Sequence, residues 1–246
     1  IASTQCGMVF SQIKEIEQQS LQSLETSRKF LDKEFTALSN HIRAYLYEYG
    51  ITMNKGQKSL RESIAVVIDD ADTRLPSSLQ NTLAILWDRY NMTRNQMKET
   101  EKNKTALVKQ LEPCKRLLEL ETVGNVCASL LYASIGDGRE FKNGRQASVY
   151  IGLTPKQHSS GGKTYMRGID KHGGNKELRA ALYQGALSII SKLPSEPRTV
   201  KEAWLIELVK RAGVKRACIA MANKTVRTAW ALLATGKSYH PVLLSK

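Results

Sequence analysis

The sequence has few of the features that mark several common protein classes. Its four cysteines, Cys6, Cys114, Cys127 and Cys218, lie far apart with no C-x-x-C pair, so neither a zinc site nor a disulfide framework is predicted. The histidines show no metal-ligand spacing, and no apolar run is long enough for a transmembrane helix. The N-terminus lacks the basic start and apolar block of a signal peptide. We therefore expect a cytoplasmic protein with reduced thiols, no membrane contact, and no metal or cofactor in this chain.

Acidic residues are scarce in the second half of the chain. The 246 residues include 37 Lys and Arg against 23 Asp and Glu, a net charge of +14. Residues 1–120 hold 17 basic and 15 acidic side chains, a net of +2, whereas residues 121–246 hold 20 and 8, a net of +12. Such a basic half favours a polyanionic partner, most often nucleic acid. Charge that serves only solubility is the alternative.

The first half is predicted to form long helices. Residues 12–49 contain no glycine or proline, and their apolar residues recur in steps of mostly three, four or seven, as in one amphipathic helix that Gly50 ends. A second helix is predicted over residues 58–71. A third begins near Ser77 and ends at Pro113, with the alternating four and three spacing of a heptad seam. Its seam positions are Leu79, Leu83, Leu86, Tyr90, Thr93, Met97, Thr100, Lys104, Leu107 and Leu111.

Polar residues interrupt the middle of this seam. Thr93, Thr100 and Lys104 fill the holes of a coiled coil poorly, although a polar centre can fix register and partner number. The seam can pair within the chain as a helical hairpin, or with a second copy as a dimerisation arm. Periodicity leaves both open. We expect a mainly α-helical protein, with a coiled-coil arm in residues 1–116 and a C-terminal domain in residues 117–246.

The C-terminal domain opens with a candidate helix–hairpin–helix over residues 117–136. An apolar helix end, a tight turn at residues 123–125 and a second apolar helix over residues 126–135 make up the pattern. Backbone N–H groups at the start of a helix can hold a phosphate, and Gly124 would let it approach closely. Glu121 would repel a phosphate. A structural turn and a nucleic-acid hairpin therefore both remain open.

Residues 151–179 are the most unusual stretch, with six of the 16 glycines, six basic residues and two acidic ones. This composition suits a Gly-rich loop or small β-hairpin whose backbone lies near an anion. The spacing fits neither a Walker loop nor a Rossmann fingerprint. Ser159 and Ser160 precede two glycines and Lys163. A serine can attack phosphorus when its proton is removed and the phosphate charge is neutralised. A simple turn is the alternative.

The order of these motifs resembles the C-terminal transposase domain of the insertion sequence 110 family, which includes pilin-gene inverting recombinases. The segment LSNHIRAYLYEYGI (38–51) also resembles the region before that family's coiled-coil arm. The matching positions are Gly124, Ile135-Gly136-Asp137, Phe141, Gly152-Leu153, Pro155, Ser160-Gly161-Gly162-Lys163, Gly168-Ile169, Lys171, Gly174-Asn175 and Leu178-Arg179.

The resemblance implies a DNA transposase or site-specific recombinase that forms a transient covalent link to DNA. Ser160 would be the nucleophile, with Ser159 as the fallback. The family also has a ribonuclease-H-like domain whose four acidic residues bind Mg²⁺. That domain would lie upstream of Ile1, so this chain alone is expected not to recombine DNA. Asp69, Asp70 and Asp72 lie in the wrong order to replace it.

The resemblance also implies partners. DNA is the expected substrate, a structured guide RNA carried by the element is a second candidate, and the helical arm predicts a homo-oligomer at the nucleoid. The alternative is a non-catalytic DNA- or RNA-binding protein derived from a decayed transposase. A third possibility is a helical oligomerisation protein with incidental charge.

Charge and spacing supply the remaining candidate contacts. Lys163 and Arg167 are candidates for neutralising the scissile phosphate, and Lys171, Arg179 and Gly124 complete the expected nucleic-acid contacts. Glu121 and Thr122 replace the usual Pro-Gly of the family's hairpin, which weakens a phosphate-binding role there. The tail adds cations that either contact a nucleic-acid backbone or form a solvated helix face: Lys210, Arg211, Lys215, Arg216, Lys224 and Arg227.

Overall fold

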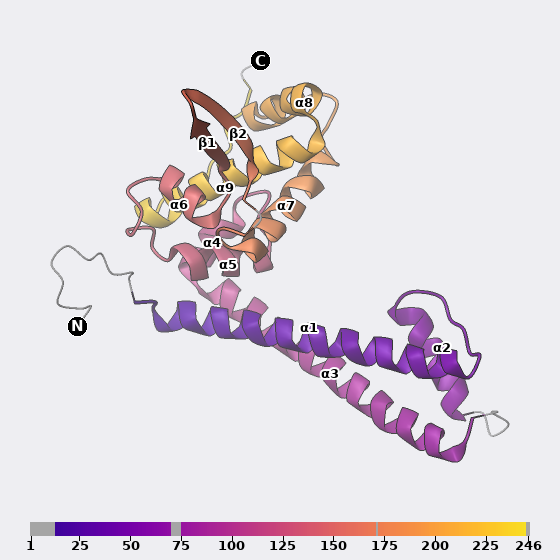
Figure 1. Ribbon diagram of the computed structural model, residues 1–246. Coiled ribbons are helices and arrows are strands. Elements are labelled where there is room, and N and C mark those ends of the chain that lie inside the picture. The colour runs from indigo at the N-terminus through magenta and orange to yellow at the C-terminus, as the bar shows by residue number, and fades with distance from the viewer. Residues whose placement is uncertain (1–12, 70–74, 171, 245–246) are drawn as a thin grey trace. The chain divides into compact units, whose positions relative to one another are not determined.

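The structure is a computed structural model that describes residues 13–69, 75–170 and 172–244. It is mainly α-helical, as predicted (Figure 1). The chain divides into two compact units, one of residues 23–104 and one of residues 1–22 with 105–246. The long helices α1 (Ile16–Glu48) and α3 (Ser77–Gln110) each contribute to both units. The predicted boundary after residue 116 lies inside the short helix α4 (Glu112–Leu118).

The unit of residues 23–104 is an antiparallel helical arm. Residues early in α1 meet residues late in α3, because Glu25 pairs with Lys104 while Glu34 pairs with Arg89 further along. Helix α2 (Gln57–Asp69) packs on both and completes an apolar core. This arrangement confirms the three predicted helices within one to four residues at their described ends. The buried core residues are Ile42, Leu46, Leu60, Ile64, Val67, Leu75, Leu83 and Tyr90.

The polar centre of the predicted seam is satisfied within the chain. The Thr93 hydroxyl is fully buried and donates to the Arg89 carbonyl at 2.9 Å. Lys104 is also fully buried, and its Nζ lies 3.3 Å from Glu25 and 2.7 Å from Glu101. The seam of α3 therefore packs on α1 of the same chain, which is the arrangement of an intramolecular hairpin.

Glu25 is the carboxylate at the centre of this buried cluster. Burial alone would raise its pKa, but hydrogen bonds from Arg28 and the charge of Lys104 outweigh burial, so the pKa of Glu25 lies below its usual value. The Arg28 Nη2 lies 2.6 Å from the Glu25 carboxylate. Two cations therefore keep one buried carboxylate ionised.

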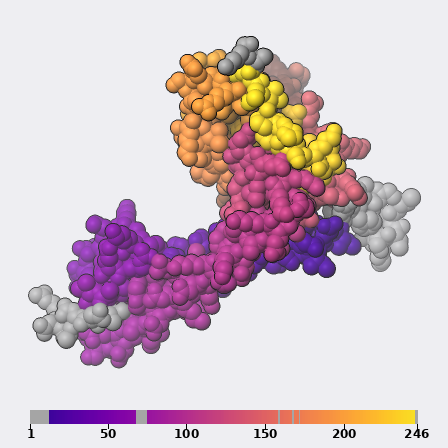
Figure 2. All heavy atoms as spheres, turned by 180° about the vertical axis from the view of Figure 1, so that it is seen from behind, coloured from indigo at the N-terminus to yellow at the C-terminus, as the bar shows by residue number. Residues whose placement is uncertain are grey.

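The second unit is built around α9 (Val214–Thr235), which packs against α4, α6, α7 and α8. Helix α4 contacts α9, and Figure 2 shows the yellow C-terminal segment, the end of α9 with the residues after it, lying against the magenta segment that contains α4. Apolar residues of α9 recur every three or four positions and face the core, while its other side carries exposed cations. The other helices are α5 (Asn125–Ile135), α6 (Gly144–Ile151), α7 (Lys176–Ile190) and α8 (Val200–Ala212).

The first turns of α1 belong to this second unit. Gln18 donates from Nε2 to the Tyr132 carbonyl of α5 at 3.1 Å, and the Tyr132 hydroxyl donates to Glu15 at 3.1 Å. Leu21 is fully buried in the same core as Val108 near the end of α3. Pro113 was predicted to end the third helix. Helix α3 ends at Gln110, and Pro113 instead lies in the first turn of α4, where its missing N–H costs nothing.

The Gly-rich stretch folds into an antiparallel β-hairpin of β1 (Pro155–Ser160) and β2 (Lys163–Ile169). Gly161 and Gly162 form its two-residue turn with φ of +57° and +74°. Positive φ at both central positions is what a type I′ turn requires, and glycine adopts it without strain. The small β-hairpin expected from the sequence is thus confirmed.

The described cysteines are buried and free. Burial raises the pKa of Cys114 and of Cys127 to about 12, so both stay protonated at neutral pH. Cys218 is also buried without a disulfide partner. Cys6 lies outside the described residues.

Candidate functional site: a clamped serine hairpin and a basic groove

The base of the hairpin is held by one arginine of α7. The Arg179 Nη1 donates to the carbonyl of Gly152, before β1, at 3.1 Å and to the carbonyl of Asp170, after β2, at 2.6 Å. One guanidinium therefore joins the entry and the exit of the hairpin. Arg179 was predicted to contact nucleic acid, and the structure places its side chain, half-buried, against the protein backbone.

The Gly-Asn pair beside Arg179 joins the hairpin to the helices. A Cβ at Gly174 would lie 2.2 Å from the Ile151 carbonyl oxygen, and its φ is +69°, so only glycine fits there. Asn175 donates its backbone N–H to the same carbonyl at 3.2 Å. Its side chain accepts from two backbone N–H groups and so caps the start of α7. This part of the family motif is structural.

An ion pair also spans the hairpin base. The Lys156 Nζ at the start of β1 lies 2.7 Å from the Asp170 carboxylate after β2. The hydrogen bond from Lys156, aided by the backbone N–H of His172, lowers the pKa of Asp170 to about 2. Lys156 thus already forms an ion pair within the protein, so its charge is compensated without a phosphate.

The tip of the hairpin carries the two candidate nucleophiles on opposite faces. Ser160 is paired across the strands with Lys163, and Ser159 with Thr164. Directly paired residues share a face and successive residues alternate, so Ser160 shares its face with Lys163 while Ser159 does not. Both serines are exposed. The Ser159 Oγ accepts from Gln157 Nε2 at 3.2 Å.

This geometry distinguishes the two serines. A phosphate that met Ser160 would also meet the ammonium of Lys163, which neutralises charge on the phosphate oxygens. Ser159 faces the other way and has no basic cross-strand partner. Arg167 lies in β2, but its side chain is outside the described part of the structure, as is Lys171 altogether.

The predicted helical hairpin is present, with α4 and α5 joined by a turn, and Gly124 caps α5. Its φ is −97°, and a Cβ there would meet nothing within 4 Å, so the fold does not require glycine. Glu121 and Thr122, which replace the usual Pro-Gly of the family, both form hydrogen bonds within the protein. The Glu121 carboxylate accepts from Lys201 at 2.6 Å, and the Thr122 hydroxyl bonds that of the buried Thr225 at 2.8 Å. Lys201 thus compensates the charge of Glu121.

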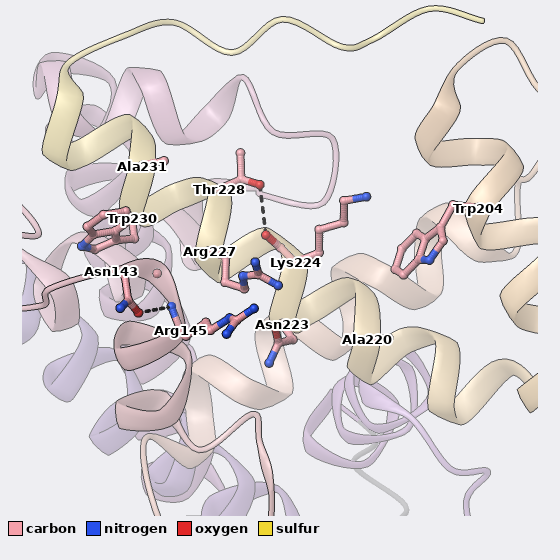
Figure 3. Close-up of a pocket in the computed structure, with 11 residues that line it drawn as sticks. Asn143, Arg145, Trp204, Ala220, Asn223, Lys224, Arg227, Thr228, Trp230 and Ala231 are labelled. Carbon is pink, nitrogen blue, oxygen red and sulfur yellow. Dashed lines mark hydrogen bonds between the residues drawn. The ribbon is translucent and has the colours of Figure 1, made fainter.

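A basic groove lies between α6, α8 and α9, with a volume of about 890 Å³ (Figure 3). We use this name for the surface formed mainly by Arg145, Trp204, Asn223, Lys224, Arg227 and Trp230. The sequence analysis names Lys224 and Arg227 among the cations of the tail, but it does not bring Arg145 together with them. The one local sequence signal is the Asn143-Gly144 pair. Asn143 caps the start of α6, and this cap places Arg145 in the first turn of that helix.

The described residues contain neither a cluster of metal ligands nor a membrane-spanning helix. Within residues 13–69, 75–170 and 172–244, no three His, Cys, Asp or Glu side chains gather in a way that could hold a metal ion. Among these described residues, none therefore forms a site that fits the Mg²⁺ that the resemblance implies. Asp70 and Asp72 lie outside the described residues. No helix in the described part is both long and apolar enough to cross a membrane.

Comparison with known proteins identifies the family. Residues 114–201, which contain the whole hairpin and Arg179, match the transposase family IS116/IS110/IS902. The chain is 37% identical over 238 residues to the transposase for insertion sequence element IS1111A of Coxiella burnetii, covering 97% of this chain and 65% of that protein. It is 32% identical over 241 residues to a probable family 20 transposase of Pseudomonas aeruginosa, covering 98% and 71%.

A more distant relative is named for a different activity. The pilin gene-inverting protein of Moraxella bovis is 26% identical over 124 residues, covering 50% of this chain and 37% of that protein. The chain spans about two thirds of the length of the Coxiella burnetii relative. On these likenesses, the chain belongs to the IS116/IS110/IS902 family of transposases.

Proposed function

We propose that this chain binds DNA and supplies the serine nucleophile of a DNA transposase or recombinase. The observation that carries the proposal is the cross-strand pair of Ser160 and Lys163 at the exposed tip of a hairpin whose base is clamped. Membership in a transposase family supports DNA as the substrate. The rigid base and the exposed tip suit a nucleophile that must reach a phosphate outside the protein.

The reaction that fits this pair is a transesterification. The Ser160 Oγ attacks the phosphorus of a phosphodiester and forms a new O–P bond, while one P–O bond to the neighbouring nucleotide breaks. The hydroxyl proton passes to solvent or a base, and the leaving oxygen takes up a proton. Lys163 stabilises the charge that gathers on the phosphate oxygens. One phosphoester replaces another, so no external energy source is needed.

The net charge of +12 on residues 121–246 provides attraction to DNA. If several phosphates are contacted, affinity should fall at least about tenfold between roughly 50 and 200 mM salt. We further propose that the chain alone stops at binding and covalent linkage, because the resemblance assigns the Mg²⁺-dependent steps to acidic residues outside the motifs found here. DNA and a guide RNA of the element are the proposed partners.

The experiment that tests the proposal is covalent trapping. The full chain is incubated with a mixed-sequence DNA duplex library in which each duplex is nicked near its centre, so that the released fragment diffuses away and cannot rejoin. A sulfur leaving atom at the phosphodiester removes the need for a proton donor. A protein–DNA adduct that survives denaturation is expected for the wild type and not for Ser160→Ala, compared at equal DNA occupancy.

Ser159→Ala is the matched control, because it removes the same hydroxyl one residue away on the other face of the hairpin. It should still give the adduct. Equal trapping of wild type and Ser160→Ala would reject the nucleophile. Salt-dependent binding with no adduct in any variant would instead support the alternative of a non-catalytic DNA- or RNA-binding protein.

We also propose that the arm mediates self-association through its outer face, because its seam is filled within the chain. Ile85 and Met92 are 69% and 52% exposed, lie seven residues apart on α3 and so share one face. Sedimentation should show an oligomer that Ile85→Lys with Met92→Lys converts to a monomer. A wild-type monomer at all concentrations would exclude this role.

A further inference from the structure

The basic groove is distinct from the serine hairpin, and it owes its form to a close approach of two helices. A Cβ at Gly144 would lie 2.9 Å from the Arg227 Cα, so glycine lets the start of α6 rest on α9. The Asn143 side chain accepts from the backbone N–H of Arg145 at 3.0 Å and fixes that first turn. Together these contacts bring Arg145 beside Arg227, although the two lie 82 positions apart in the sequence.

The cations of the groove face one another without an acid between them. Figure 3 shows the side chains of Arg145 and Arg227 directed into the same space, with Lys224 on the next turn of α9. No acidic residue lines the groove among the residues that the structure describes. Like charges this close repel each other, and a bound anion relieves that repulsion. The groove therefore favours binding of an anionic ligand.

Lys224 is held by an aromatic ring. Its Nζ lies 4.5 Å from the centre of the Trp204 ring, a cation–π contact. Burial lowers the pKa of Lys224, and the nearby charges of Lys201 and Arg227 lower it further. A phosphate beside Lys224 would offset both effects, because it favours the charged form of the amine.

The groove also presents aromatic surface. Trp204 of α8 and Trp230 of α9 both line it. The Trp230 Nε1 donates to the Gly138 carbonyl at 2.9 Å, which fixes that ring in place. Cations along a groove combined with aromatic rings are the usual features of a surface for single strands, whose unpaired bases can stack. A duplex hides its base faces and is more often entered by a protruding helix.

The groove continues toward the hairpin. Ala220 and Asn223 line both the basic groove and a neighbouring cavity of about 690 Å³ beside β2, whose rim includes Lys215 and Arg216. From Arg216 to Arg227 the chain advances 11 residues along α9, about 16 Å of helix at 1.5 Å per residue.

We propose that the basic groove binds one single-stranded segment of nucleic acid, with phosphates on Arg145, Arg227 and Lys224 and a base against Trp204. The inference rests on the proposed function for its class of ligand, but it assigns a second site, outside the serine hairpin. A DNA strand and an RNA strand present the same phosphodiester chemistry, and the experiment separates them.

The test measures binding of three probes of about 12 nucleotides by the full chain: single-stranded DNA, single-stranded RNA and duplex DNA of the same sequence. We expect a single strand to bind more tightly than the duplex, and the tighter of the two single strands identifies the source. Arg145→Gln with Arg227→Gln should weaken that binding and lower the slope of log affinity against log salt by about 1.4 for two lost phosphates.

The matched control is Lys192→Gln with Lys237→Gln, which removes the same charge from two exposed positions outside the groove. It should change the salt slope much less. Trp204→Leu should weaken single-strand binding more than duplex binding, and thermal melts confirm that each variant is folded. Equal losses in both double variants, or a duplex bound as tightly as either strand, would overturn the groove proposal.

Strand binding tests the basic groove, whereas the covalent adduct tests Ser160, so the two proposals can fail independently. If the arginine double variant keeps wild-type strand binding while the adduct at Ser160 still forms, only the groove is rejected. If strand binding falls as expected while no wild-type adduct forms, the groove stands and the nucleophile is rejected.

Discussion

The guanidinium of Arg179 donates to the carbonyl oxygen of Asp170 at 2.6 Å, so a residue of α7 fixes the exit of the serine hairpin. The same Nη1 also reaches Gly152 at the hairpin entry. A side chain that resembles a DNA contact in sequence is thus used to hold two peptide groups. We therefore regard Arg179 as a positioning residue for Ser160.

Replacing Arg179 should loosen the hairpin. Arg179→Ala leaves the Gly152 and Asp170 carbonyls without this donor and should lower the free energy of unfolding by about 1.5–3 kcal/mol. Hydrogen exchange of residues 155–169 should speed up, and the trapping rate should fall more than DNA affinity does. Arg179→Lys should restore part of the trapping rate. If affinity falls while hairpin exchange is unchanged, Arg179 contacts DNA instead.

Protonation of Asp170 should occur only in strong acid. Its pKa is lowered to about 2 by Lys156 and backbone N–H groups, so the ion pair is fully present at neutral pH and is lost as the pH falls through about 2. In Lys156→Gln, the pKa of Asp170 should move up toward its usual value. NMR titration of the Asp170 carboxyl measures this. An unchanged pKa would mean that Lys156 is not its main partner.

The helices could be predicted because their signals are local. A long stretch without Gly or Pro and a three-and-four apolar spacing depend on neighbouring residues alone, so α1, α2 and α3 were found. Whether the α3 seam pairs within the chain could not be predicted, because that depends on Glu25 meeting Lys104 across 79 positions. Pro113 was misplaced because proline suits the start of a helix as well as its end.

Two glycines of the family motif should lose very different amounts of stability on substitution. Gly174→Ala places a methyl group 2.2 Å from the Ile151 carbonyl oxygen at a φ of +69°, and should cost at least about 3 kcal/mol of stability. Gly124→Ala meets open space and should cost less than about 1 kcal/mol. Urea unfolding measures both.

DNA binding by Gly124→Ala then tests its other predicted role. If a phosphate approaches the backbone at the start of α5, the methyl group should weaken DNA binding in a variant that remains folded. Unchanged affinity would leave the α4–α5 turn as a structural element.

The buried cluster of the arm should behave as a coupled unit. Glu25→Ala leaves the fully buried Lys104 with Glu101 alone and should lower the free energy of unfolding by about 3 kcal/mol. Glu25→Leu combined with Lys104→Met replaces the pair by apolar groups of similar volume and should cost far less. A double-mutant cycle measured in urea gives the coupling, and additive losses would show that the pair is not coupled.

The candidate site was only partly predictable. Ser160 and Lys163 are close in sequence, and the two glycines between them already indicate a hairpin turn, so their pairing follows from local geometry. The role of Arg179 is not visible in sequence, because an exposed and a backbone-bound arginine look alike there. The basic groove depends on α6 meeting α9, and this contact joins residues distant in the chain.

Peptide mapping of the trapped protein–DNA adduct is the most direct test of Ser160 as the nucleophile. After nuclease and protease digestion, mass spectrometry should locate the nucleotide remnant on Ser160, in the peptide that contains the hairpin tip. A remnant on Ser159 or on any other residue, or an adduct that persists in Ser160→Ala, would contradict the assignment.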